Sequence, residues 1–256
     1  GVVVDQGVGR KKVPVTVGAL GSETRISVLA TNEAGEETEG SLTLRPADVD
    51  LVWEGRTYTP PLYSGRPLSN GNSGAVVTAV PHVIGSAGVR VPASELMYVC
   101  SINGTEAKSI SGKGRSTIVM RSSLDRAPVV AVTVSTKDKL VVADESAVIE
   151  TQTPSAVIYE NSPLGGILFN KAIAGAVAFS EEEISFTAFP VFVTNPDALS
   201  YQWSLSGTPF VLDEENPRVA TFRKTGEGTG SYTVSFSFND IARLFEHATR
   251  AFSLTF

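Results

Sequence analysis

The sequence contains few of the residues on which covalent and metal chemistry depend. It has one cysteine, Cys100, among 256 residues, so no internal disulfide can form. Its two histidines, His82 and His247, lie in different parts of the chain, so we do not expect them to share a metal ion or a proton relay. No histidine accompanies Cys100 in the sequence, and a cysteine nucleophile needs such a base. We therefore expect ordinary buried or solvated positions for these residues, no catalytic residues and no enzymatic activity.

The chain also lacks an excess of positive charge and a long hydrophobic run. Its formal net charge is -6, which argues against a nucleic-acid partner, because such a partner requires a concentrated basic surface. The longest apolar stretches, such as residues 172–179, are much shorter than the ~20 residues of a spanning helix. Residues 1–4 have the pattern of the middle of a strand. We therefore expect the chain to be a fragment, with any targeting segment or membrane anchor outside it.

Short runs of β-branched and aromatic residues dominate the sequence. In residues 232–238, Tyr, Val and Phe alternate with Thr and Ser, which is the period of a strand with one buried and one wet face. Turn signals separate the runs, including Asn32–Gly35, Ser69–Asn72 and Asn103–Gly104. Runs of this length and spacing predict an all-β protein built of sandwiches. Further runs of this kind occupy residues 26–30, 41–44, 129–134 and 184–189.

One segment has a different period. After Asn239 and Asp240, apolar residues recur at i, i+3, i+4 and i+7, the spacing of one helix face. Asp240 is a good N-cap residue type. The pattern predicts a short helix near the C-terminus, between the last two strands; its apolar residues are Ile241, Leu244, Phe245 and Ala248.

The sequence repeats internally. Residues 199–207 match residues 96–104 at a constant offset, and residues 218–222 match residues 115–119 at the same offset. The repeat length is roughly a hundred residues, which is the size of one sandwich. The first part of the chain contains a third, partial copy, in which three segments resemble the last three strands of the unit: residues 9–17, 23–30 and 40–44.

These matches divide the chain into three parts. Residues 1–46 are expected to be the C-terminal part of a truncated unit, and residues 47–154 and 155–256 are each expected to be a complete sandwich. The linkers between them are short and contain apolar residues. We therefore expect a semi-rigid string of domains rather than domains on a flexible tether.

Tyr201–Gly207, with the pattern Tyr-x-Trp-x-Leu-x-Gly, resembles the third strand of immunoglobulin-like and PKD-like modules. The resemblance implies that Trp203 packs across a sandwich and that a turn follows. In the middle unit Cys100 occupies the position of the tryptophan, so bulk elsewhere is expected to compensate. The sequence lacks the paired cysteines of antibody-type domains. In this respect it resembles bacterial and PKD-like modules. Residues 45–54, with Tyr58-Thr59-Pro60-Pro61 after them, resemble uncharacterised multi-domain surface proteins of ultrasmall candidate-phylum bacteria.

Acidic residues cluster at Glu181–Glu183 and at Asp213, Glu214 and Glu215. Calcium prefers several oxygen ligands from a looped backbone, and extracellular modules often use such clusters. The Asp-x-Asp-x-Asp-Gly pattern of a calcium loop is missing, however. The sequence therefore predicts no cofactor. Calcium at Asp213–Glu215 is the first hypothesis and calcium at Glu181–Glu183 is a weaker one; a solvated turn is the alternative for both.

Three aromatic residues near the first expected domain boundary are candidates for ligand binding. Trp53, Tyr58 and Tyr63, together with Pro60 and Pro61, could form a flat platform of the kind that binds sugars. The favoured interpretation is that they pack between two domains.

Three functional hypotheses remain open. The favoured one is a non-enzymatic structural or adhesive protein, extracellular or on the cell surface, as inferred from the architecture. Its partner would be a protein, a surface glycan or a second copy paired through edge strands. The second hypothesis is a carbohydrate-binding accessory module of a larger exported enzyme. The third is an enzyme.

Overall fold

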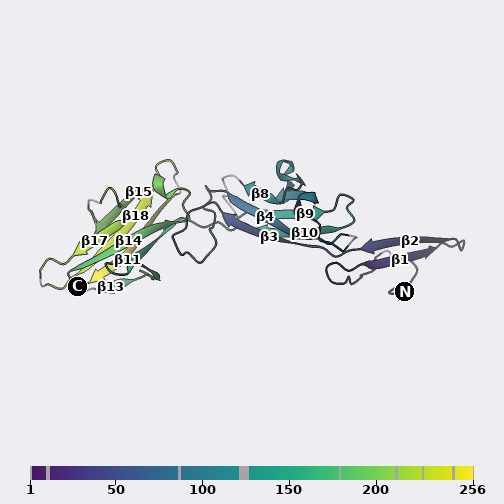
Figure 1. Cartoon of the computed structure of the whole chain (residues 1–256), viewed down its shortest axis with the longest axis horizontal. Helices are drawn as coiled ribbons and strands as arrows, with labels where there is room; N and C mark the ends of the chain where they lie inside the picture. The colour runs from purple at the N-terminus through teal and green to yellow at the C-terminus, as the bar shows by residue number, and fades with distance from the viewer. Residues whose placement is uncertain are drawn as a thin grey trace. The chain divides into compact units, whose positions relative to one another are not determined.

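The computed structural model describes residues 2–9, 12–85, 88–120, 127–178, 180–210, 213–226, 228–243 and 246–255. The chain forms two compact units (Figure 1). The first contains residues 1–52, 77–118 and 129–148, and the second contains residues 53–76, 119–128 and 149–256. Regular structure in the described ranges is almost entirely β-strand, which confirms the all-β prediction. The three-part division by repeats stays a prediction. No helix in the described ranges is long and apolar enough to cross a membrane.

Strands β1 (Thr24–Thr31) and β2 (Glu37–Leu44) form a separate antiparallel hairpin. Ile26 pairs with Leu42 and Val28 pairs with Gly40, so the alternation of side chains places the apolar residues on one face. That face stays open to solvent, since Val28 is 60% exposed and Leu42 is 55% exposed. Residues 12–18, where a further strand of a truncated unit was expected, are not in a strand.

The next strands form two sheets, most of which lie in the first unit. One sheet has the order β3-β4-β8 and the other has the order β10-β9-β5-β6, with β7 paired to β5. Along β4, buried side chains alternate with half-buried ones, and Ala75, Val77 and Ala79 are buried. The strands are β3 (Asp48–Gly55), β4 (Ala75–His82), β5 (Met97–Ile102), β6 (Thr105–Glu106), β7 (Gly112–Lys113), β8 (Thr117–Met120), β9 (Val129–Ser135) and β10 (Val142–Val148).

The second unit is a two-sheet sandwich. One sheet has the order β12-β11-β14-β17 and the other has the order β13-β19-β18-β15-β16. The strands are β11 (Ser155–Ser162), β12 (Gly166–Ala172), β13 (Ala176–Ala178), β14 (Glu183–Val191), β15 (Ser200–Leu205), β16 (Thr208–Pro209), β17 (Val219–Arg223), β18 (Ser231–Asn239) and β19 (His247–Thr255).

This strand order agrees with the immunoglobulin-like prediction. In such a sandwich, strands A, B and E share one sheet with strand D, and strands C, F and G form the other. Here β11, β14 and β17 occupy the positions of A, B and E, while β15, β18 and β19 occupy those of C, F and G. The position of strand D, beside β17, has no strand among the described residues.

Both sheets of the second unit contribute to one core. Trp203 of β15 is fully buried, and its ring centroid lies 4.9 Å from that of Phe236 on β18. Across the sandwich, Phe186 of β14 lies 4.8 Å from Phe252 of β19. The tryptophan therefore occupies the core position that the resemblance implied. The remaining core residues are Ala156, Ile158, Ile173, Ala188, Val193, Leu199, Ala220, Val234, Phe238 and Leu254.

The sequence repeat is also a repeat of local structure. Short 3-10 helices, η1 (Ala93–Glu95) and η3 (Pro196–Ala198), precede β5 and β15; a third, η2 (Lys108–Ile110), follows β6. The hydroxyl of Tyr98 donates to the Ala93 carbonyl at 3.1 Å, and that of Tyr201 donates to the Pro196 carbonyl at 2.6 Å. Burial raises the pKa of Tyr201 to about 12, so the hydroxyl keeps its proton near neutral pH.

The hairpins after these strands also match. Asn103 and Gly104 join β5 to β6 with φ of 50° and 78°, and Ser206 and Gly207 join β15 to β16 with φ of 48° and 84°. Positive φ at both central residues is the geometry of a tight type I′ hairpin. Cys100 is buried at the position that corresponds to Trp203, and burial raises the pKa of its thiol.

The described residues contain no short C-terminal helix, and its prediction was wrong. Residues 240–243 form turns, Ala248 lies in β19, and Leu244 and Phe245 lie outside the described residues. Strands β18 and β19 stay paired as far as Asn239 and His247, which leaves only residues 240–246 to reverse the chain. Asp240 closes this turn, because its Oδ1 accepts from the Ala242 amide at 2.8 Å and its own amide donates to the Glu246 carbonyl at 2.9 Å.

The core of the second unit predicts the effect of truncating Trp203. Trp203→Ala is expected to lower the free energy of unfolding of this unit by about 3–5 kcal/mol, because it leaves a large cavity between the sheets. Urea denaturation monitored by circular dichroism measures the change. Leu164→Ala, at a position that is 101% exposed, is the control and should change the free energy by less than about 0.5 kcal/mol. Equal effects of the two substitutions would contradict the assigned core.

Candidate functional site

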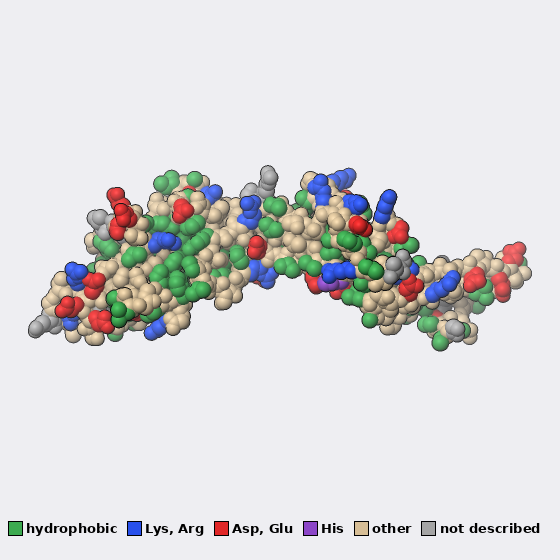
Figure 2. Space-filling model, in the orientation of Figure 1, with side chains coloured by type: hydrophobic (Ala, Val, Ile, Leu, Met, Phe, Trp, Pro, Cys, Tyr) green, Lys and Arg blue, Asp and Glu red, His purple; other side chains and the backbone are tan. Residues whose placement is uncertain are grey.

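The acidic residues chosen from the sequence form an exposed turn. Asp213 Oδ1 accepts from the Glu215 amide at 3.0 Å, and the Asp213 carbonyl accepts from the Asn216 amide at 3.2 Å. Within the described ranges, no group of three or more His, Cys, Asp or Glu side chains is placed to hold a metal ion. The calcium hypothesis for Asp213, Glu214 and Glu215 therefore stays a prediction. In the face that Figure 2 shows, Lys and Arg side chains are interspersed with Asp and Glu.

The three candidate aromatic residues do not form one exposed platform. Trp53 is only 7% exposed, and the Arg66 guanidinium lies 4.1 Å from the centroid of its ring. Tyr58 is partly buried against the core of the second unit. Tyr63 is 40% exposed and meets the edge of Phe192, with ring centroids 5.9 Å apart. Packing therefore accounts for all three residues, and their role as ligand-binding residues stays a prediction.

Tyr58 and Tyr63 belong to the segment that follows β3. We call residues 56–74, which join β3 to β4, the connecting segment. It follows Gly55, where an added Cβ would lie 2.3 Å from the backbone of Leu68 and Ser69. Only glycine permits this close approach. The segment is closed at its base, because the Arg56 amide donates to the Gly74 carbonyl at 2.8 Å.

Backbone hydrogen bonds fix the connecting segment to the strands of the second unit. The Tyr58 amide donates to the Val193 carbonyl at 2.7 Å, and the Phe192 amide donates to the Tyr58 carbonyl at 2.8 Å. Further along, the Gln152 amide donates to the Ser69 carbonyl at 2.7 Å, so the segment bonds to the chain just before β11 as well as just after β14. A loop fixed at both places behaves as part of the sandwich.

A buried carboxylate, Glu246, forms the centre of this docking. Its side chain is fully buried, and Oε1 accepts from Asn70 Nδ2 of the connecting segment at 2.8 Å. The Thr194 amide donates to Oε2 at 3.1 Å, and the Thr194 hydroxyl donates to Oε1. Arg243 Nη1 lies 3.9 Å from Oε2. A buried carboxylate is tolerated only when its oxygens are satisfied in this way.

The connecting segment is folded locally to present Asn70. Asn70 Oδ1 accepts from the amides of Asn72 and Ser73 at 3.0 Å and 2.8 Å, which turns its Nδ2 toward Glu246. The Ser73 hydroxyl accepts from the Asn70 amide at 3.1 Å, and the Ser69 hydroxyl donates to the Ser73 carbonyl at 2.9 Å. Ser69, Asn70 and Ser73 are all buried, so these bonds are shielded from water.

This site is not evident from the sequence. Residues 69–72 have only the pattern of a turn, and Glu246 lies within the segment that was expected to be helical. The available signal was the Ser-Asn-Gly-Asn-Ser run, whose side chains cap their own turn. Its partner could not be identified, because Asn70 and Glu246 are 176 positions apart.

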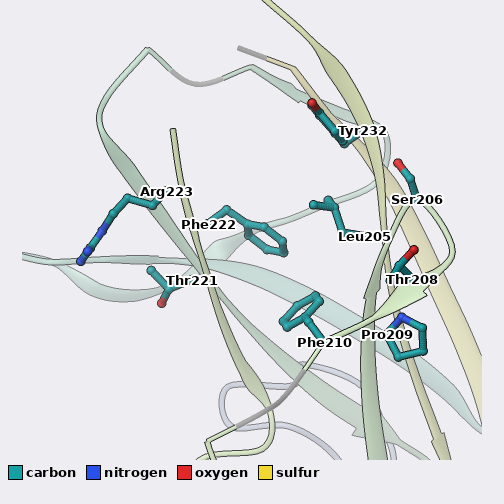
Figure 3. A pocket seen from close by; sticks show the side chains of 9 residues that line it. All are labelled: Leu205, Ser206, Thr208, Pro209, Phe210, Thr221, Phe222, Arg223 and Tyr232. Carbon is teal, nitrogen blue, oxygen red and sulfur yellow. The ribbon is translucent and has the colours of Figure 1, made fainter. Parts of the chain in front are cut away.

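The second unit also contains a cavity of about 510 Å³ at one side of the sandwich. Its walls come from the β15–β16 hairpin and from β17, and Figure 3 shows Leu205, Phe210 and Phe222 pointing into it. Polar groups lie at its margin, namely Ser206, Thr208, Thr221, Arg223 and the hydroxyl of Tyr232. A cavity of this size and apolar character suits aliphatic or aromatic groups.

Comparisons with known proteins concern the fold alone. No protein-family model and no curated protein matches the chain. Among solved structures, the three N-terminal domains of the Highly Immunogenic Outer Capsid protein (Hoc) of bacteriophage RB49 are 15% identical, with a TM-score of 0.41; the match covers 82% of this chain and 59% of that one. Fibronectin(III)-like modules of CbhA from Clostridium thermocellum are 13% identical, with a TM-score of 0.27, over 80% of this chain and 92% of theirs.

The buried network predicts a large effect for a small substitution. Asn70→Ala removes a hydrogen bond to a buried carboxylate and should lower the free energy of unfolding of the second unit by about 1.5–3 kcal/mol. Urea denaturation measures it. The matched control is Asn72→Ala in the same turn, because the Asn72 side chain makes no hydrogen bond within the described residues. If the two alanine variants are equally stable, the assigned role of Asn70 is wrong.

Proposed function

We propose that the chain is a non-enzymatic structural or adhesive part of an extracellular or cell-surface protein, in which immunoglobulin-like sandwiches form a semi-rigid string. The fold supports a binding or structural role but does not by itself name one. Labelling of intact source cells with antibodies to the purified chain tests the location. Staining only after lysis would contradict it.

The single observation that carries the structural part of the proposal is the docking of the connecting segment. This segment enters through β3 and leaves through β4, yet it belongs to the second unit. Two of the five chain crossings between the units, at residues 52/53 and 76/77, therefore flank this segment. The hydrogen bonds of Tyr58, Ser69 and Asn70 fix the segment at separate points. A double crossing that is fixed in this way restricts bending more than a single flexible linker does.

Nitrogen-15 relaxation of the whole chain tests this proposal. In a semi-rigid string, the backbone amides of both units report one rotational correlation time, that of the whole chain. Asn70→Ala should loosen the connecting segment and give the two units separate, shorter correlation times, whereas Asn72→Ala should leave them unchanged. Separate, shorter correlation times in the unaltered protein would contradict the semi-rigid string.

A further inference from the structure

The cavity of the second unit lies at the open edges of both sheets. Strand β16 is the last strand of one sheet and β17 is the last strand of the other, and both contribute to its lining. The position of strand D beside β17 is empty among the described residues. An additional strand placed there would extend the sheet of β17 and bring alternate side chains over the cavity.

The backbone of β17 can accept such a strand. The Ala188 amide donates to the Arg218 carbonyl at 2.9 Å, and the Lys224 amide donates to the Glu182 carbonyl at 2.9 Å. Alternate residues of an antiparallel strand bond to the same neighbour. It follows that Thr221 directs its amide and carbonyl away from β14, toward the open edge. These two groups have no partner within the described residues, which makes the edge a template for pairing.

The surroundings of this edge favour a basic ligand. Glu181–Glu183 lie at the start of β14, beside the end of β17, and Asp213–Glu215 lie in the turn before β17. All six side chains are exposed. Arg223 is paired with Glu183 at 2.7 Å, and Arg218 and Lys224 flank β17, so three cations offset only part of the six negative charges. A strand with basic residues next to aliphatic ones matches both the charge and the cavity.

The chain itself contains a segment of this chemistry. Residues 12–17 read Lys-Val-Pro-Val-Thr-Val, and Arg10 and Lys11 precede them in the sequence. Val13, Val15 and Val17 alternate with Pro14 and Thr16, which is the period of a strand, yet residues 12–17 are not in a strand. Val13 is 45% exposed and Val17 is 41% exposed.

We propose that residues 12–17 of one copy pair with the free edge of β17 in a second copy, with the valines over the cavity and Lys12 near the acidic residues. Pro14 fits this arrangement, because proline cannot donate to a ladder and is tolerated on an edge strand when its nitrogen faces solvent. The added strand could run parallel or antiparallel to β17. With the valine side chains over the cavity, one of these two directions points the backbone amides and carbonyls of Val13, Val15 and Val17 toward β17. In that direction Pro14 faces outward and prevents a further strand from adding.

The proposed contact joins two different surfaces. Repetition of such a heterologous contact gives a closed ring or an open filament. The inference deepens the proposed structural role by naming the partner as a second copy and the acceptor as the edge of β17.

Sedimentation velocity of the whole chain over a concentration series tests the inference. The unaltered protein should form dimers and larger species as its concentration rises. Val15→Asp, which places a charge against the apolar cavity, and Thr221→Pro, which removes the outward amide, should each sediment as a monomer. An equal mixture of the two variants should form a dimer and nothing larger. Val15→Asp keeps an intact β17 edge and Thr221→Pro keeps an intact segment 12–17, so only one contact can form between them.

Matched variants control for charge and for proline in a strand. Val3→Asp alters another exposed valine, and Val119→Pro alters an exposed residue of β8, the last strand of its sheet. Both variants should associate like the unaltered protein. A synthetic peptide of residues 12–19 should dissociate the assemblies even if Thr221→Pro does not fold. The inference is overturned if the unaltered protein is monomeric throughout, if Val15→Asp still associates, or if the mixture stays monomeric. The nitrogen-15 relaxation experiment tests whether the string is semi-rigid, and its result does not depend on whether two copies associate.

Discussion

The second unit depends on the satisfaction of one buried carboxylate. Glu246 is buried with no exposed surface, and its oxygens accept hydrogen bonds from Asn70 and Thr194. Burying a carboxylate is costly, and the cost is offset only while these donors stay in place. The turn after β18, the end of β14 and the connecting segment must therefore be positioned together. Three segments that are distant in sequence are thus fixed by one side chain.

The two copies of the repeated motif have side chains of different size at the same core position. In the second unit, Trp203 fills the centre of the sandwich against Phe236 and other aromatic side chains. At the corresponding position of the other repeat, Cys100 is small and buried. Its neighbours Leu96 and Tyr98, which correspond to Leu199 and Tyr201, are fully buried as well. The conserved geometry of the Asn103-Gly104 and Ser206-Gly207 hairpins shows that backbone constraints are kept more strictly than side-chain size.

Much of this fold could be predicted from the sequence because its signals are local. Alternation in residues 232–238 predicted β18, and the repeated motif predicted the buried position of Trp203. The helix prediction failed because the pairing of Asn239 with His247 overrides a short apolar periodicity. The docking site could not be predicted, since a single glutamate in a turn looks solvated until its distant donors are known. Calcium binding at Asp213–Glu215 likewise depends on further oxygen ligands, which the positions of residues in the sequence do not reveal.

Hydrogen–deuterium exchange shows whether the connecting segment is an integral part of the second unit. The amide of Tyr58 is bonded to Val193, and the amide of Asn70 is bonded to a buried serine hydroxyl. The account predicts that both amides exchange as slowly as those of β11 and β14, because they are released only when the sandwich opens. Exchange at the rate of an exposed loop, while β11 and β14 stay protected, would contradict it.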